Sequence, residues 1–160
     1  MAAKSKKLAA RLILAFDPGS SAGVALYVDG KFVGSASVNG TSHRALMRAA
    51  SNLIEAANGW EVPTEARLAV IEDGFGRGLG AKTLDRRRGM CAAAAESCGI
   101  ENVRYVYPST WHSRMFVATK SAEMKSEAMA WCKERLQHQP QTHDEAEACV
   151  LGHFVVQYGC

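Results

Sequence analysis

The sequence predicts one α/β domain with a mixed central sheet that is flanked by helices. Three short β-prone runs follow one another closely between residues 11 and 38, and apolar runs of strand length then alternate with segments of helical periodicity. Strands joined by tight turns pair as an antiparallel meander, whereas strands separated by helices pair in parallel. A length of 160 residues, of which 48% are hydrophobic and 22% charged, fits a single globular domain.

The three opening strands are marked by the turns between them. Residues 11–16 (RLILAF) are β-prone and stop at the turn sequence Asp17-Pro18-Gly19. A second apolar run covers residues 23–28 and leads through Asp29-Gly30 into a third run, residues 31–38. Asp-Gly between two β-prone runs is a strong indication of a hairpin. We therefore expect these runs to form the antiparallel meander.

The later elements follow from the spacing of apolar side chains. Apolar residues that recur every three or four positions indicate a helix, and a short apolar run between turn residues indicates a strand. These patterns predict a helix over residues 46–57 with Thr41 or Ser42 as its cap, a strand over 67–71, a helix over about 82–98, a strand over 103–107, a helix over about 121–136, and a last helix from Thr142 or His143 through 156. A glycine-rich loop over residues 74–80 leads into the second of these helices.

The first ten residues are predicted to be a basic arm, and residues 11–160 the folded domain. Lys4, Lys6 and Lys7 precede the first acid of the chain, and Arg11 interrupts the apolar stretch that a signal peptide would need. An organellar presequence is the alternative for this acid-free segment. No apolar run approaches the 18 or so residues of a membrane-spanning helix, so we expect no such helix.

The five cysteines predict a reducing, intracellular setting. They are odd in number and contain no C-x-x-C pair. We therefore expect neither a zinc ribbon nor a disulfide framework.

The charges are unevenly distributed, although the net charge is only +3. Five cations and one acid, Asp85, lie between Arg77 and Arg88, whereas the chain from Gln141 onward has three acids and no Lys or Arg. A cationic band beside a compact acidic group suggests a polyanion held near a metal. Solvated helix faces would produce the same pattern, and charge alone favours that simpler explanation.

Four acids are candidates for one site. Asp17 and Glu72 each follow directly on an apolar strand, where a carboxylate is costly unless it is paired, capped or bound to a metal. Asp144 and Glu147 are three residues apart and share one helix face. Taken singly, the strand-end acids could serve turns or caps, and the helical acids could serve the helix dipole. Together, four convergent carboxylates suit two Mg²⁺ or Mn²⁺ ions that promote phosphodiester cleavage.

Three stretches of the chain resemble the motifs of RuvC-type Holliday junction resolvases, in that family's order and near its spacing. They are residues 13–20 (ILAFDPGS) with 23–26 (GVAL), residues 69–75 (AVIEDGF), and residues 144–148 (DEAEA). The resemblance implies an RNase H-like fold and a Mg²⁺-dependent homodimer that nicks two opposing strands of a four-way DNA junction. Pro108–Trp111 (PSTW) resembles an element of phage-type members, in which we expect the tryptophan to lie in the core.

The resemblance also implies roles for individual residues. The metal-binding catalytic acids would be Asp17, Glu72, Asp144 and Glu147, although the family commonly has Asp at the last position. Lys125 matches a lysine placed near the scissile phosphate, and Lys120 competes for that role. His143 would orient a water or contact phosphate, or it is an ordinary residue at a helix start.

The predicted DNA contacts are one aromatic and a set of basic side chains. Phe75 corresponds to an aromatic that stacks on an unpaired base, and its alternative role is to anchor the loop 74–80. The basic candidates for phosphate contacts are Arg77, Lys82, Arg86, Arg87, Arg88, Arg114 and Lys120. The Ala-rich segment 90–95 corresponds to a helix that builds much of the family's dimer interface.

The predicted function is that of a crossover junction endodeoxyribonuclease in DNA recombination and repair, with two Mg²⁺ ions per site and Mn²⁺ as the alternative. Its location would be the cytoplasm of a bacterium or of a phage-infected cell, with an organelle as the alternative. Three other functions stay open: a branched-DNA nuclease that cuts forks and flaps, a non-catalytic junction-binding module, and an ATP-binding domain of the actin and sugar-kinase superfamily. The last of these needs two such domains, and 160 residues supply one.

Overall fold

Five strands form one mixed sheet in a computed structural model that describes residues 10–40, 42–74 and 79–160. Their order across the sheet is β3-β2-β1-β4-β5. The strands are β1 (Leu12–Asp17), β2 (Ser21–Val28), β3 (Lys31–Asn39), β4 (Arg67–Glu72) and β5 (Val103–Val106). The first three strands pair antiparallel, and β4 pairs parallel with both β1 and β5. The predicted mixed sheet with an opening meander is therefore confirmed.

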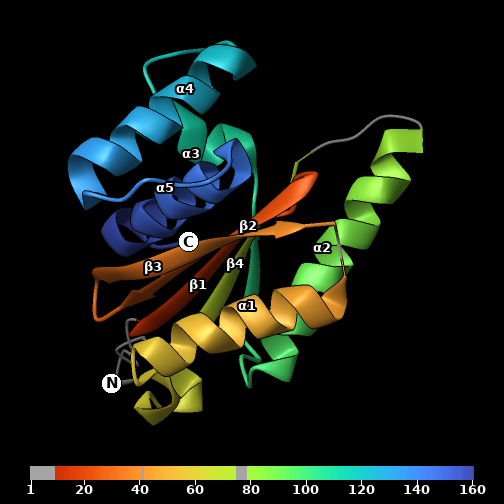
Figure 1. Cartoon of the computed structure of the whole chain (residues 1–160), viewed down its shortest axis with the longest axis vertical. Coiled ribbons are helices and arrows are strands. Elements are labelled where there is room, and N and C mark those ends of the chain that lie inside the picture. Colours follow the sequence, from red (N-terminus) through yellow and green to blue (C-terminus); the bar gives the residue numbers. More distant parts are fainter. Residues whose placement is uncertain (1–9, 41, 75–78) are drawn as a thin grey trace, which may run out of the picture.

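Helices cover both faces of this sheet (Figure 1). The helices are α1 (His43–Ala56), α2 (Leu79–Ser97), α3 (Pro108–Met115), α4 (Ser121–Trp131) and α5 (His143–Tyr158), with single turns η1 (Gly59–Glu61), η2 (Thr64–Ala66) and η3 (Cys132–Leu136). Helices α1 and α2 lie on one face, whereas α5, together with α3 and α4, lies on the other. None of the helices in the described ranges is long and apolar enough to cross a membrane.

Two apolar cores result, one on each side of the sheet. The even-numbered side chains of β1 belong to the core under α1 and α2, and Ile13 and Ala15 belong to the core under α5. In β4 the same alternation assigns Leu68 and Val70 to the α5 side. Because side chains alternate along a strand, the last residues of β1 and β4, which are acidic, continue the rows that face α5.

Helix α3 is the element that the sequence patterns do not predict. From the sequence, Pro108 is predicted to end the preceding strand. It instead occupies the first turn of α3, where a missing N–H group costs no hydrogen bond. Trp111 on this helix is fully buried, as expected for the PSTW element. The predicted helix over about 121–136 is confirmed in its bounds: α4 continues into the π-helical turn η3 at Cys132, and the left-handed Gln137 ends it.

The remaining boundaries differ by a few residues. Helix α2 begins at Leu79, three residues before the predicted start at 82. The side chain of Ser42 caps α1 by accepting a hydrogen bond from the Ala45 N–H group, whereas the other candidate, Thr41, lies outside the described residues. All five cysteines are free thiols, as predicted. Residues 1–9 of the predicted basic arm also lie outside the described residues, so its boundary with the domain stays a prediction.

Candidate active site

Three carboxylates gather where the end of β1 meets the start of α5. Asp17, Asp144 and Glu147 each place an oxygen within 4.8 Å of the others. Asp17 ends β1 and is only 7% exposed, whereas the other two lie on the first turns of α5 and are partly buried. Residues that are more than 120 positions apart in the chain therefore converge on one small volume.

The start of α5 is held against the turn between β1 and β2. The Ser21 N–H group donates a hydrogen bond of 3.1 Å to Oδ2 of Asp144. A Cβ atom added to Gly19 would lie 2.2 Å from that same oxygen, and one added to Gly23 would lie 2.0 Å from the Asp144 carbonyl oxygen. Only glycine leaves room for this approach, so the turn that ends β1 also positions a carboxylate of the site.

Glu145, between the acids of the site, anchors α5 to the edge strand β3. Its carboxylate is 2% exposed and accepts hydrogen bonds from Ser35 Oγ at 2.5 Å and from the Gln141 N–H group at 2.8 Å. Nε2 of His138 lies 3.2 Å from the same carboxylate. The Thr142 hydroxyl caps the helix by accepting from the Glu145 N–H group. Sequence reasoning missed this anchor, although the Thr-x-x-Glu pattern of a capping box could have indicated it.

Glu72 lies beside the three carboxylates and not within their group. It ends β4, and its charge is close enough to raise the pKa of both Asp17 and Glu147. Its Oε2 atom, however, lies 3.5 Å from Nε2 of His112 on α3. Three of the four expected carboxylates thus lie within 4.8 Å of one another, and the fourth, Glu72, lies near them and beside a histidine that sequence reasoning did not single out.

Two carboxylates of the group, Asp17 and Glu147, resist ionisation. Burial raises the pKa of Asp17 well above its usual value, and the negative charges of Glu72, Glu147 and Asp144 raise it further. Burial also raises the pKa of Glu147, with a further contribution from Glu72, whereas the positive charge of Lys125 lowers it. Without a cation, Asp17 and Glu147 therefore hold protons at a pH at which exposed carboxylates have lost theirs.

The two lysines predicted near the scissile phosphate differ in their surroundings. Lys125 on α4 is half-buried and acts electrostatically on Glu147. Lys120 is 81% exposed, and its ammonium lies 3.8 Å from Glu123. Phe75 and Arg77, by contrast, lie outside the described residues.

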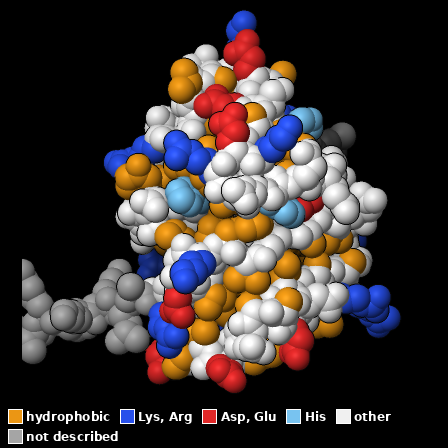
Figure 2. All heavy atoms as spheres, turned by 60° about the vertical axis from the view of Figure 1, so that its left-hand side comes forward, with side chains coloured by type: hydrophobic (Ala, Val, Ile, Leu, Met, Phe, Trp, Pro, Cys, Tyr) orange, Lys and Arg blue, Asp and Glu red, His pale blue; other side chains and the backbone are white. Residues whose placement is uncertain are grey.

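The other basic candidates lie on α2. Lys82 and Arg86 are exposed, whereas Arg87 is partly buried. Arg88 forms ion pairs with Asp73 and Asp85 and donates to the Gly74 carbonyl at 3.3 Å. On the face shown in Figure 2, the Lys and Arg side chains of described residues are interspersed with acidic ones and do not form one continuous patch.

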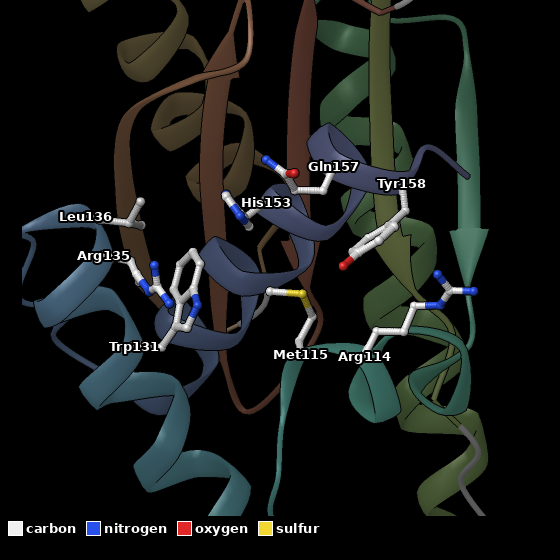
Figure 3. A pocket seen from close by; sticks show the side chains of 8 residues that line it. All are labelled: Arg114, Met115, Trp131, Arg135, Leu136, His153, Gln157 and Tyr158. Atoms are coloured by element: carbon white, nitrogen blue, oxygen red, sulfur yellow. The ribbon is translucent and has the colours of Figure 1, made fainter.

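Arg114 belongs to a separate groove at the other end of α5 (Figure 3). Its guanidinium carbon lies 5.0 Å from the centre of the Tyr158 ring. The groove has a volume of about 530 Å³ and is lined by Arg114, Met115, Trp131, Arg135, Leu136, His153, Gln157 and Tyr158. At 1.5 Å per residue, Gln157 is roughly 20 Å along the helix from Asp144. The structure therefore separates Arg114 from the carboxylates.

The comparisons with known proteins find similarity at the level of the fold. No family model and no curated protein matches the sequence. A structure of Thermus thermophilus RuvC in complex with a Holliday junction substrate has a TM-score of 0.62 and 16% identity, over 92% of this chain and 96% of that chain. The chain has a RuvC-like fold. A second structure of T. thermophilus RuvC, with a TM-score of 0.61 and the same identity and coverage, agrees with this assignment.

The RuvC-like fold explains why the carboxylates converge. Parallel strands β1 and β4 end at the same edge of the sheet, so Asp17 and Glu72 are brought together there. Helix α5 crosses the same face and begins at this edge, where it adds Asp144 and Glu147. The arrangement offers oxygen donors, with Lys125 of α4 close enough to act electrostatically on Glu147, which suits the binding of a divalent cation next to a phosphate.

Proposed function

We propose that this protein is a divalent-metal-dependent endodeoxyribonuclease that resolves Holliday junctions by paired nicks. The observation that carries the proposal is the buried group of Asp17, Asp144 and Glu147, with Glu72 beside it, at the sheet edge of a RuvC-like fold. The similar T. thermophilus protein is in complex with a Holliday junction substrate. We infer the same class of substrate for this chain.

The donor set fits a hard divalent cation such as Mg²⁺ or Mn²⁺. Among the described residues, none of the ion pairs to a Lys or Arg involves Asp17, Asp144 or Glu147. The negative charge of three carboxylates within 4.8 Å of one another is thus neutralised by protons or by a metal ion. A bound ion would supply a Lewis acid for the scissile phosphate and a lowered pKa for an attacking water.

The chain's own groups hold this site in place. The Ser21 N–H group fixes one oxygen of Asp144, which leaves the other oxygen available as a ligand. Burial of Asp17 in the sheet keeps water from competing for its carboxylate. The ammonium of Lys125 is proposed to stabilise negative charge on the phosphate as the bond breaks, because it already lies close enough to Glu147 to lower its pKa.

The proposed DNA surface extends from the site along the start of α2. Phe75 is proposed to stack on an unpaired base, and the cations proposed to contact phosphates are Arg77, Lys82, Arg86, Arg87 and Arg88, with Lys120 on the α4 side. Because Arg88 already has two acidic partners, its contribution is expected to be smaller than that of exposed Lys82.

A homodimer is proposed because two equivalent sites would address two equivalent strands of a junction. The segment 90–95 of α2 is only partly available for this contact. Cys91, Ala94 and Ala95 are buried in the core under α1. Met90, Ala92 and Ala93 are partly buried, and the first two also pack against this core, so only their exposed parts are proposed to meet a second copy.

Cleavage of synthetic DNA tests the proposal. The protein is incubated with a four-way junction, a fork, a flap and a linear duplex, with Mg²⁺, with Mn²⁺ and with EDTA, and the products are resolved on a denaturing gel. We expect symmetric nicks in the junction that depend on metal. Equal cleavage of forks and flaps would identify a less selective branched-DNA nuclease, and binding without nicking at any metal concentration would identify a junction-binding module.

A further inference from the structure

Nε2 of His112 on α3 lies directly opposite Oε2 of Glu72 at the end of β4. Nε2 of His112 and Oε2 of Glu72 are 3.5 Å apart, and their side chains are only 20% and 17% exposed. Neither atom is accessible to solvent, and neither has a hydrogen-bond partner among the described residues. Buried polar atoms without partners are rare in native proteins, and a pair of them at one place indicates that something binds between them.

The imidazole of His112 is fixed by its surroundings. Its ring lies 4.2 Å from the fully buried Trp111 ring and 5.5 Å from the Phe116 ring, measured between centres. These aromatic contacts restrict the rotamers that the side chain can adopt. The direction of Nε2 toward Glu72 is therefore set by the packing of α3, and the pair cannot easily separate to find other partners.

A single cation would satisfy both atoms. Metal bonds to histidine nitrogen and carboxylate oxygen are about 2.0–2.2 Å long. Two ligand atoms on one ion can thus lie up to about 4.2 Å apart, and the observed separation of 3.5 Å is within this limit. By contrast, Asp17, Asp144 and Glu147 bring three ligand atoms within 4.8 Å of one another without Glu72. Glu72 is free to hold a second ion.

We propose that His112 is a metal ligand, which binds through Nε2 together with Glu72 and adds a nitrogen donor to an otherwise all-oxygen site. This inference rests on the proposed function, since it assigns one ligand of the same metal centre. Imidazole is a poor ligand for Mg²⁺ and a better one for transition metals. The Glu72–His112 position accordingly selects Mn²⁺ over Mg²⁺.

The test is spectroscopic and does not depend on cleavage. Mn²⁺ is added to the full-length protein, and electron spin echo modulation reports whether a nitrogen is bound to the ion. We expect nitrogen coupling in the wild type, its loss in His112→Gln, and its retention in His143→Ala, which removes the nearby histidine beside Asp144. Glutamine keeps a hydrogen-bond donor near Glu72 but is a poor ligand, so it separates ligation from orientation of the carboxylate.

Calorimetric titrations with Mn²⁺ and Mg²⁺ give the second measurement. The preference for Mn²⁺ is expected to fall about tenfold or more in His112→Gln and His112→Ala, and to stay unchanged in His43→Ala, an exposed histidine on α1. If His112→Ala does not fold, the wild-type coupling and the glutamine variant still decide the question.

The possible failures are distinguishable. Mn²⁺ that binds the wild type without nitrogen coupling, or with coupling that persists in His112→Gln, would overturn the assignment of His112 and leave the proposed nuclease intact. A wild-type protein that binds neither Mn²⁺ nor Mg²⁺ would overturn both.

Discussion

The two faces of the sheet surround a buried charged residue with opposite kinds of neighbour. On the α1 and α2 side, the buried Arg67 donates hydrogen bonds to the carbonyl oxygens of Val62 at 2.8 Å, Trp60 at 2.8 Å and Cys98 at 3.5 Å. On the α5 side, the buried Asp17 is surrounded by other carboxylates. The first charge is satisfied by the fold, whereas the second is the one that we propose a metal ion satisfies.

This contrast separates a structural from a functional use of charge. A buried ion whose three nitrogens each donate a hydrogen bond to a backbone carbonyl ties η1, β4 and the end of α2 together. A buried cluster of like charges lowers the stability of the metal-free fold and is retained for what it binds. The two residues should therefore respond to substitution with opposite signs in stability.

Asp17→Asn should have the largest effect on activity. Asparagine keeps the shape of the side chain but removes a ligand charge, so junction nicking is expected to fall about 100- to 1,000-fold or more while junction binding is preserved. Removing the repulsion within the cluster should raise the melting temperature of the metal-free protein. Gel cleavage assays, binding assays and thermal unfolding in EDTA measure the three quantities. Normal cleavage by this variant would remove Asp17 from the site.

Arg67→Met should have the reverse pattern. Methionine fills the volume but leaves three carbonyl groups without a donor, at a cost of about 1–3 kcal/mol for each group that water cannot reach. The free energy of unfolding, measured with urea, should fall, and cleavage per folded molecule at low temperature should be unchanged. If Arg67→Met and Asp17→Asn shifted stability in the same direction, the distinction between the two faces would be wrong.

Most of this arrangement could be predicted from the sequence, because the arrangement depends on local patterns. Because Asp17 and Glu72 each follow directly on an apolar strand, both could be expected at strand ends, and the parallel pairing of those strands brings these ends to one edge of the sheet. The spacing of Asp144 and Glu147 follows from helix geometry. What could not be predicted depends on contacts between distant segments.

His112 and Glu145 are the clearest examples of such contacts. The proximity of His112 to Glu72 requires knowledge of α3, an eight-residue helix too short for a periodicity signal and begun by a proline that also reads as a strand end. The Thr-x-x-Glu pattern could indicate that Glu145 takes part in a helix cap, but not its burial, which depends on its contacts with Ser35 and His138.

Gly23→Ala should separate the geometry of the carboxylates from their charge. The added Cβ would lie 2.0 Å from the Asp144 carbonyl oxygen, so α5 must move away from β2. Overpacking of this kind costs about 1–3 kcal/mol, and the affinity for Mn²⁺ should fall because Asp144 is displaced from Asp17. Urea unfolding and calorimetry measure the two effects.

Gly89→Ala is the matched control for Gly23→Ala. Gly89 lies within α2 with no atom within 4 Å of the added Cβ. Because alanine favours helix, this change should stabilise the protein by about 0.5–1 kcal/mol with no effect on metal binding. Equal losses of Mn²⁺ affinity in both variants would show that the close approach at Gly23 does not position the site.

The smallest expected effect is a pH dependence of stability that is specific to the α5 side. In the metal-free protein, the raised pKa values of Asp17 and Glu147 mean that the folded chain keeps protons that the unfolded chain releases above about pH 4. Stability should therefore fall as the pH rises from about 4 toward these raised values. The lowered pKa of Asp29, which is hydrogen-bonded to Arg11, contributes with the opposite sign, so the slope in the wild type must be compared with that of Asp17→Asn.

Melting temperatures in EDTA should decline less steeply with pH in the variant. Addition of Mn²⁺ should abolish the decline in the wild type, because the ion replaces the protons and binds more tightly as they leave. Identical slopes in the two proteins would mean that Asp17 is ionised in the folded state without a metal, and its burial among like charges would then no longer distinguish the two faces.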